Sequence, residues 1–343
     1  MGDRRGPQGR ARRRPPPDGP QRPARELVTF PKISSLPGAL AIAGLLVFPL
    51  AAQQRTVAIT IDDLPVAQSG AGACAIERLE PLTRTLLAPF RKRQVPLTAF
   101  VIGSRCADEL TDDQRRAILQ LWQDAGAEIG NHSYSHRSYT SSPPEEYLPD
   151  VLRGDQELQQ LTGRPTRYFR SPMLHTGPTP QTRDQLRAFL AEHDFQQSPV
   201  TFDNADWQFS FLLAHAIQTG DKDLERRIEE AYVPYIESVV AFFEKRSVEV
   251  VGREIHQIHL MHSNVLNMRR SEELLAMFER RGYRFISLEE ALRDPAYALP
   301  NDYASGNGIS WFHRWSMTKG MPNKGEPDPP QWLLDAYESL TSR

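Results

Sequence analysis

The chain contains the stretch Ile129-Gly-Asn-His-Ser-Tyr-Ser-His-Arg-Ser-Tyr139, whose centre is the pair His132 and His136. Histidines four residues apart lie on one face of a helical turn, where two imidazoles can reach one metal ion. The pair follows a short apolar strand predicted over Ala127–Ile129 and should lie at its C-terminal end, where α/β folds place active sites. A surface loop with two incidental histidines is the alternative. The zinc-protease signature is excluded, because Ser133 stands where that signature has glutamate.

Strand and helix patterns alternate on both sides of this stretch. Runs rich in β-branched and apolar residues predict strands over Thr56–Ile61, Leu97–Ile102, Ala127–Ile129, Arg167–Arg170, Phe195–Phe202, His256–Met261 and Tyr283–Ser287. Apolar residues at helical spacing predict helices over Ile76–Gln94, Thr111–Gly126, Ser142–Gly163, Pro180–His193, Asp221–Lys245, Ser271–Gly282 and Leu288–Arg293. A capping box at Ser142 is expected to open the third helix, and Asp203–Trp207 reads as a polar loop. Such alternation indicates a single distorted (β/α) barrel of seven or eight units with parallel strands.

Composition divides the 343 residues into three parts. Residues 1–54 should be a disordered basic N-terminus and a secretion signal: the first 25 residues hold eight arginines and six prolines, and the run Leu36–Ala52 is uncharged and apolar. An uncleaved N-terminal anchor is the alternative reading of that run. Residues 55–297 should form the barrel. Residues 298–343, rich in Gly, Pro and Trp, are expected to be an extension packed on it.

Charge and cysteine content exclude several classes of protein. A net charge of −2, with 24% charged residues, shows no bias towards nucleic acid or membrane surfaces. Neither a nucleic-acid partner nor a protein partner is implied, and no stable membrane insertion is expected after signal cleavage. Cys74 and Cys106 are too few for a cysteine-rich metal site. Each follows a neighbouring strand on its C-terminal side, so one disulfide is expected in an exported protein, two unpaired thiols being the alternative.

Polar residues follow four further predicted strands. Two end the first strand, one ends the fourth, two follow the fifth and one follows the sixth: Asp62, Asp63, Arg170, Asp206, Trp207 and His262. A single polar strand end means little and is usually a solvated cap. Because the carboxyl ends of parallel strands meet on one face of a barrel, these residues and the histidine pair should gather at one site.

These clusters resemble the ordered motifs of the polysaccharide deacetylase family, also called carbohydrate esterase family 4 or the NodB homology domain. The resemblance covers about Val57 to Leu292. In order, the five motifs are similar to Thr60-Ile-Asp-Asp63, His132-Ser-Tyr-Ser-His136, Arg170-Ser-Pro-Met173, Asp206-Trp207 and Leu260-Met-His262. The order and the separations agree with the family pattern, and an ordered set of this kind is far more specific than any one motif.

The resemblance implies one divalent metal ion held by Asp63, His132 and His136. Two imidazoles and one carboxylate leave coordination positions open for water and a substrate carbonyl. Zn²⁺ is the expected metal, although Co²⁺, Ni²⁺ or Fe²⁺ would accept the same ligands.

The resemblance also implies the catalytic roles. Asp62 would be the general base that takes a proton from the attacking water. Arg170 would be the cation that keeps Asp62 ionised, through a bidentate contact that a lysine cannot make. His262 would protonate the leaving amine, and Asp206 would hold and tune that imidazole.

Three residues are expected to contact the substrate. Trp207 would form an apolar wall for the acetyl methyl group or the sugar face, and the backbone N–H of Met173 would stabilise the tetrahedral oxyanion. His175, in the loop of the third motif, would touch the substrate as well. The chain departs from the family pattern within the same groove. Leu64 replaces a glycine, Ser263-Asn264 follows the last histidine in place of aspartate, and the third motif lacks the usual Arg-Pro-Pro-Tyr-Gly.

The leading hypothesis is an exported, metal-dependent hydrolase that removes N-acetyl groups from N-acetylated sugars of a glycan by attack of metal-activated water. Peptidoglycan or a chitin-like polymer would be the substrate, and the periplasm, the cell envelope or the exterior the location. A hydrolase of another small amide or ester on the same scaffold is the first alternative. The second is a non-catalytic glycan-binding module, which should have lost a metal ligand or Asp62, and none is lost.

Overall fold

Seven parallel strands alternate with helices over residues 54–67 and 72–342, which are the residues described by the computed structural model. The strands are β1 (Arg55–Leu64), β2 (Leu97–Val101), β3 (Ala127–Asn131), β4 (Tyr168–Phe169), β5 (Gln196–Gln197), β6 (Gln257–His262) and β7 (Tyr283–Ile286). The helices are α1 (Ile76–Arg93), α2 (Asp112–Asp124), α3 (Pro144–Thr162), α4 (Pro180–Glu192), α5 (Asp206–Thr219), α6 (Lys222–Val251), α7 (Val265–Arg280), α8 (Leu288–Leu292), α9 (Trp311–Thr318) and α10 (Gln331–Thr341). Two 3₁₀ turns, η1 (Pro172–Leu174) and η2 (Pro295–Ala298), complete the described elements. The predicted basic N-terminus and the apolar run Leu36–Ala52 lie outside the described residues.

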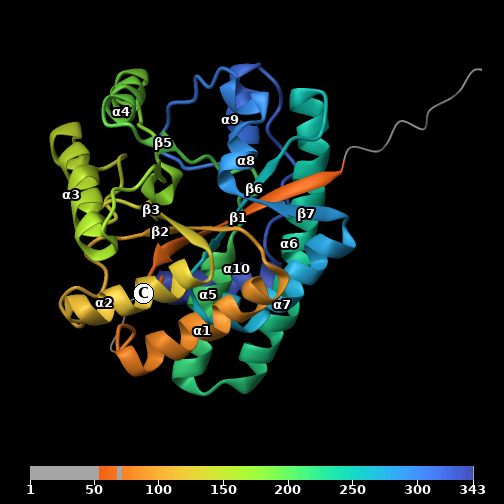
Figure 1. Cartoon of the computed structure of the whole chain (residues 1–343). Coiled ribbons are helices and arrows are strands. Elements are labelled where there is room, and N and C mark those ends of the chain that lie inside the picture. The colour runs from red at the N-terminus through yellow and green to blue at the C-terminus, as the bar shows by residue number, and fades with distance from the viewer. Residues whose placement is uncertain (1–53, 68–71, 343) are drawn as a thin grey trace, which may run out of the picture. The chain divides into compact units, whose positions relative to one another are not determined.

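The strands form a distorted barrel. Neighbouring strands follow the order β5-β4-β3-β2-β1-β6, and β7 pairs with the first half of β1, from Arg55 to Ala58. The chain beyond β5 closes the circle, because Phe202 pairs in parallel with His259 of β6. Figure 1 shows the strands at the centre with the helices arranged around them. The predicted fold, a distorted (β/α) barrel of seven or eight units with parallel strands, is confirmed, with seven strands in the described residues.

Alternation along β1 separates the inside of the barrel from its outer layer. Ile59 and Ile61 join the large core cluster that packs beneath α1, α6 and α7, whereas Ala58 belongs to a smaller cluster with Phe100 and Ile258. Successive side chains of a strand point to opposite faces, so Ala58, Thr60 and Asp62 share the inner face. Asp62 therefore ends the row of inward side chains at the carboxyl end of the strand, where it lines a cavity.

Several element boundaries differ from those predicted. Helix α3 begins at Pro144 with Pro143 as its N-cap and without a side-chain cap, so the capping box predicted at Ser142 is wrong. Strand β5 covers two residues of the predicted Phe195–Phe202, because Pro199 has no N–H to give to a ladder. Helix α5 replaces the end of the predicted polar loop. Its apolar residues lie on more than one face, and no single helical stripe marked it in the sequence.

A disulfide joins the loops that follow β1 and β2. The Cα atoms of Cys74 and Cys106 lie 5.4 Å apart, and the pairing predicted from their places after neighbouring strands is confirmed. The C-terminal extension packs on the barrel as predicted. Trp315 is 1% exposed, and the ring of Phe312 stacks on that of Phe243 in α6. Among the helices of the described residues, none is long and apolar enough to cross a membrane.

Candidate metal centre and active site

A cavity of about 670 Å³ opens at the carboxyl ends of the strands. Its walls are Asp62, Asp63, His132, His136, Met173, Leu174, His175, Asp203, Asn204, Trp207, Leu260, His262, Asn307, Gly308 and Ile309. Eight of the ten predicted site residues are in this set. The other two, Arg170 and Asp206, are fully buried behind the cavity wall and contact residues that line it.

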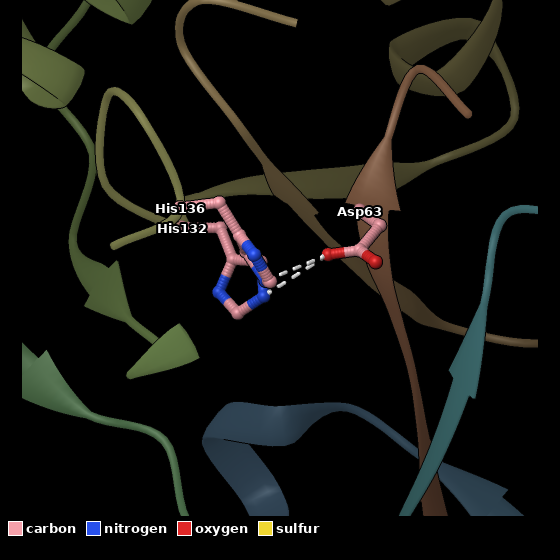
Figure 2. A group of neighbouring side chains, drawn as sticks. All are labelled: Asp63, His132 and His136. Carbon is pink, nitrogen blue, oxygen red and sulfur yellow. Dashed lines mark ion pairs between the residues drawn. The ribbon is translucent and has the colours of Figure 1, made fainter. Parts of the chain in front are cut away.

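One carboxylate oxygen faces both imidazoles. Oδ1 of Asp63 lies 3.4 Å from Nε2 of His132 and 3.2 Å from Nε2 of His136. Figure 2 shows the aspartate reaching in from β1 while the two histidines come from a separate loop. The ring centroids of the histidines are 4.9 Å apart. Three potential ligand atoms thus converge from segments that lie about seventy residues apart in the sequence.

Two consecutive aspartates reach the same site because the end of β1 is irregular. In a regular strand, the side chains of Asp62 and Asp63 would point to opposite faces. Asp63 instead has a left-handed backbone with φ of 66°, and the pairing register with β2 shifts between Ile61 and Leu64. Asp and Asn tolerate the left-handed region better than most residues, so this conformation suits the position. The shift turns Asp63 back towards the cavity.

The histidine pair lies in a loop, so the helical turn predicted from its spacing is wrong. Ser133 and His136 both have positive φ, 63° and 54°, which a helix does not contain. Hydrogen bonds within the loop fix its path: Ser133 N donates to the Asn131 side chain, and His136 N donates to Ser133 Oγ. The Nδ1–H of His132 donates to the carbonyl of Arg170 at 2.8 Å. That bond selects the tautomer whose Nε2 lone pair faces Asp63.

The chemistry of this cluster fits a divalent cation. Oδ1 of Asp62 and Oδ1 of Asp63 are buried without a hydrogen-bond donor, an arrangement that costs free energy in an apolar surrounding. Burial alone would raise the pKa of Asp63, but its contacts with His132 and His136 and the charge of His262 outweigh it and hold that pKa well below the usual range. Within the described part of the chain, Asp63, His132 and His136 are the only group of three or more such side chains placed to hold a metal ion.

Arg170 lies beneath Asp62 at the end of β4. Its Nη1 is 3.4 Å from Asp62 Oδ2, while Nη2 donates to Thr60 Oγ1 and to Ser198 Oγ, each at 3.0 Å. The guanidinium also stacks 4.7 Å above the ring of Phe100. The predicted bidentate contact with Asp62 is wrong, because the guanidinium divides its donors among three partners. Burial lowers the pKa of Arg170, and the neighbouring carboxylates oppose that shift.

His262 and Asp206 form a hydrogen-bonded pair, and His262 lines the same cavity as Asp63, His132 and His136. The Nδ1–H of His262 donates to Asp206 Oδ1 at 2.6 Å, and its backbone N–H donates to Asp206 Oδ2 at 3.0 Å. Asn267 of α7 donates a further bond to the same Oδ2. Burial by itself would lower the pKa of His262, but Asp206, helped by Asp63 and Asp62, raises it to about 10. The carboxylate thus orients the ring and favours the imidazolium.

The predicted substrate contacts lie at the cavity mouth. Met173 and Trp207 are 46% and 48% exposed, respectively. The Trp207 ring meets Tyr337 of α10 edge to face, at 5.4 Å between centroids. His175 lines the cavity, and its Nδ1 pairs with Ser138 Oγ at 2.9 Å. Burial, followed by the nearby charge of Arg314, lowers the pKa of His175.

Sequence reasoning missed part of the cavity. Asp203 and Asn204 precede Asp206, and Asn204 Nδ2 donates to the Leu260 carbonyl at 2.7 Å. Burial raises the pKa of Asp203 to about 7. The nearness of both residues to Asp206 could have singled them out. Residues 307–309 come from the C-terminal extension, and no motif or spacing in the sequence placed them at the site.

Comparisons of the sequence with known proteins cover less than half of the chain. Residues 50–194 match the sequence model of the polysaccharide deacetylase family, a span that holds the aspartate pair, both histidines and Arg170. The Peptidoglycan-N-acetylglucosamine deacetylase of Bacillus cereus is 24% identical over 152 residues, 44% of this chain and 46% of that protein. The chain therefore spans about half the length of the curated relative that it matches.

Solved structures of similar proteins include a carbohydrate esterase and a pseudoenzyme. A family 4 carbohydrate esterase from Streptomyces lividans, in complex with acetate, is 20% identical with a TM-score of 0.46, covering 70% of this chain and 97% of that one. A wild-type pseudoenzyme of the same family from Bacillus anthracis is 18% identical with a TM-score of 0.46, covering 70% and 66%. The match over residues 50–194 contains the first three of the five motif-like clusters, those of Asp63, His132 and Arg170. The other two, Asp206-Trp207 and Leu260-Met-His262, follow later in the chain. Residues 50–194 therefore carry the sequence pattern of the polysaccharide deacetylase family, carbohydrate esterase family 4, and the described chain has the distorted barrel that agrees with it.

Proposed function

We propose that the protein is a metal-dependent hydrolase that removes N-acetyl groups from the N-acetylated sugars of a glycan. The observation that carries the proposal is the convergence of Asp63, His132 and His136 on a cavity that also presents Asp62 and the His262–Asp206 pair. Amide hydrolysis at such a site needs a metal ion, a general base and a general acid. The ligand cluster would hold the metal, the second carboxylate would be the base, and the imidazole with raised pKa would be the acid. Peptidoglycan and chitin-like polymers are the proposed substrates, because the curated relative is a peptidoglycan-N-acetylglucosamine deacetylase.

The metal would be held by Asp63 Oδ1 and by the Nε2 atoms of His132 and His136. When bound, it would polarise the acetyl carbonyl and lower the pKa of water. Zn²⁺ suits a set of two imidazoles and one carboxylate, and Co²⁺, Ni²⁺ and Fe²⁺ can replace it.

Asp62 is the proposed general base. Its Oδ2 is 3.8 Å from His132 Nε2, beside the ligand cluster, and its Oδ1 has no donor. As water attacks the acetyl carbon, its proton passes to Asp62. Arg170 lies buried under the same carboxylate and balances its charge from the side away from the cavity.

His262 is the proposed general acid. Its Nδ1–H is committed to Asp206, so Nε2 is the ring atom left to give a proton to the sugar nitrogen. When the carbon–nitrogen bond breaks, that proton completes the amine, and the acetyl group leaves as acetate. The Met173 N–H would stabilise the oxyanion, while Trp207 would face the acetyl methyl or the sugar ring and His175 would contact the substrate.

Two of the departures from the family pattern have roles in the fold. Leu64 is fully buried in the core. Ser263 Oγ donates to the Pro65 carbonyl, and Asn264 caps the start of α7. These contacts explain the residues without changing the reacting groups. The remaining departure, in the loop Ser171–His175, lies in the cavity wall, and for this reason another small amide or ester is the second candidate substrate class.

An exported location agrees with the disulfide between Cys74 and Cys106, since such bonds persist in oxidising compartments. The substrates proposed here, peptidoglycan and chitin-like glycans, also occur outside the cytoplasm. The periplasm, the cell envelope and the exterior are the proposed locations.

The test uses protein stripped with a chelator and reloaded separately with Zn²⁺, Co²⁺ or Ni²⁺. Acetate and new primary amines are counted on peptidoglycan, on chitin oligomers and on an O-acetylated glycan. Deacetylation of amino sugars gives one amine per acetate, whereas an esterase gives acetate without amine. A loaded, folded protein that binds these glycans and releases acetate from none would be a non-catalytic module, and the proposal would fail.

A further inference from the structure

The C-terminal extension reaches the cavity. Residues 307–310, here called the crossing segment, contribute Asn307, Gly308 and Ile309 to the cavity wall. The chain is tied to the barrel before and within this segment, because Ser305 N donates to the Gly177 carbonyl and Ser310 Oγ donates to the Thr201 carbonyl. In Figure 1 the blue C-terminal chain runs between α4 and α9, and Arg183 of α4 donates to its Asp302 carbonyl. A segment from outside the matched span 50–194 therefore borders the site.

Gly308 packs directly on the backbone of the third-motif loop. A Cβ atom added at Gly308 would lie 1.7 Å from the carbonyl oxygen of Met173 and 2.8 Å from its carbonyl carbon. Real Cβ atoms do not approach backbone so closely, so any other residue must push the two segments apart. The position requires glycine because two main chains touch there.

The side chain of Arg314, in α9, hydrogen-bonds to the same loop. Its Nη2 donates to the Leu174 carbonyl at 2.5 Å, its Nη1 to Thr176 Oγ1 at 2.7 Å, and its Nε to the Ile309 carbonyl at 2.9 Å. The side chain is fully buried, and among the described residues Asp203 is the carboxylate whose charge acts on it, without a hydrogen bond between the two. Burying a cation without a paired carboxylate costs free energy. The hydrogen bonds of the Arg314 guanidinium offset part of that cost and join the loop to the crossing segment.

The loop needs such support because its backbone is strained. Met173 and Leu174 are consecutive residues with positive φ, 54° and 56°, a region that non-glycine residues adopt only when their surroundings enforce it. Within the loop, the Leu174 and His175 amides donate to the Ser171 and Pro172 carbonyls, each at 3.0 Å. The contacts from Gly308 and Arg314 supply the remaining restraint.

We propose that the C-terminal extension is part of the active site: Gly308 and Arg314 position the Pro172–Thr176 loop, and with it the Met173 N–H, for the reaction. The consequence for catalysis rests on the proposed deacetylase function. The positioning itself does not, and it can be measured separately. Arg314 is thus a positioning residue that acts through Met173 and Leu174.

The sharpest test is Gly308→Ala with Gly306→Ala as its matched control. The Cβ added at Gly306 meets only Thr140 Cγ2, at 3.2 Å, and neither glycine has a positive φ. Loss of one oxyanion donor costs about 10²–10³-fold in kcat. Gly308→Ala should therefore lower kcat by about that factor with a much smaller change in KM, because the contact forms in the transition state. Gly306→Ala should stay within about twofold of the wild type, and the metal content of both should be unchanged.

A second measurement does not depend on activity. Hydrogen exchange followed by mass spectrometry on peptides covering residues 168–178 should show faster exchange at Leu174 and His175 in Gly308→Ala and Arg314→Met, but not in Gly306→Ala. Arg314→Lys keeps the charge and can restore one of the three bonds, so its exchange and kcat should be intermediate. Gly308→Ala decides the matter by itself if Arg314→Met does not fold.

The outcomes separate the two proposals. A wild type without activity on any acetylated glycan contradicts the deacetylase function, yet faster exchange in Gly308→Ala would still support the positioning. If exchange in Gly308→Ala equals that of Gly306→Ala, the positioning is overturned. Faster exchange with an unchanged kcat would overturn the link between the extension and catalysis.

Discussion

Replacing Asp206 by asparagine should move the basic limb of the pH–rate profile to lower pH. The reason is that Asp206 is the strongest of the charges that raise the pKa of His262, through a 2.6 Å hydrogen bond to its Nδ1. A general acid works while it is protonated, so activity is present below the pKa of His262 and is lost above it. Asparagine keeps the shape of the side chain and removes the charge, which lowers this pKa and brings the loss of activity to lower pH.

The size of the shift follows from the surroundings of His262. Its pKa is about 10, against an ordinary value of 6.5, and Asp63 and Asp62 also contribute to the increase. A cation bound to Asp63 cancels part of their contribution, so we assign to Asp206 about 2 pH units, or about 3 kcal/mol. At pH 9 the asparagine variant should therefore lose about 10-fold in rate beyond any loss at pH 6. The acidic limb, which does not depend on His262 in the proposed mechanism, should stay nearly in place.

The same pair links stability to pH. A histidine with a raised pKa in the folded state adds stability that is fully present below its unfolded pKa of about 6.5 and is lost as the pH rises through about 10. The wild type should therefore lose more stability between pH 7 and pH 10 than Asp206→Asn does, as measured by chemical unfolding at each pH.

The assay for the pH–rate profile of Asp206→Asn is amine release from a chitin oligomer between pH 5 and pH 10.5 at saturating metal. Metal content and thermal unfolding are measured on each variant, so that a lost ligand or a lost fold is not mistaken for a lost acid. His262→Ala is the companion variant, and it should lose the basic limb and most of the rate while it keeps its metal. A basic limb that stays in place in Asp206→Asn, or a His262→Ala protein without metal, would refute the reasoning.

Three further outcomes are expected. Wild-type protein should bind about one equivalent of divalent metal by elemental analysis, and His136→Ala should lose it, because the imidazole is one of three converging ligands; a folded, active wild type without metal would contradict this. Asp62→Asn should keep the metal yet lose about 10²–10⁴-fold in rate, whereas Asp63→Asn should bind metal weakly; equal metal content in both would show that base and ligand are wrongly assigned. Replacing Cys74 and Cys106 by serine should lower the free energy of unfolding by about 3–4 kcal/mol, because the bridge spans 32 residues; a change below about 1 kcal/mol in denaturant titration would contradict the loop-entropy argument.

Much of the candidate site was predictable because its chemistry lies at strand ends. The carboxyl ends of parallel strands meet on one face, so residues at or just beyond the ends of β1, β3, β4, β5 and β6 had to be neighbours if the alternation was right. The boundaries of helices and strands were harder to predict. Helix α5 escaped the sequence pattern because Phe209, Leu212 and Leu213 are buried while Phe211 is exposed, which leaves no narrow apolar stripe. Strand β5 was overextended because Pro199 interrupts an otherwise strand-like run.

The sequence by itself determined the strand–helix alternation, the parallel barrel and the set of ligand types, because these depend on local periodicity and on residue chemistry. Only the tertiary structure decided how the groups are aimed. Asp62 and Asp63 share one site because a shift in register turns the backbone of Asp63, and Arg170 divides its donors because Thr60 and Ser198 lie within reach. Contacts that span 140 residues, such as the one from the Arg314 side chain to the Leu174 carbonyl, leave no periodic trace in a sequence. Such contacts arise when the folded barrel brings two distant segments together, and the complementarity of their surfaces determines which residues touch.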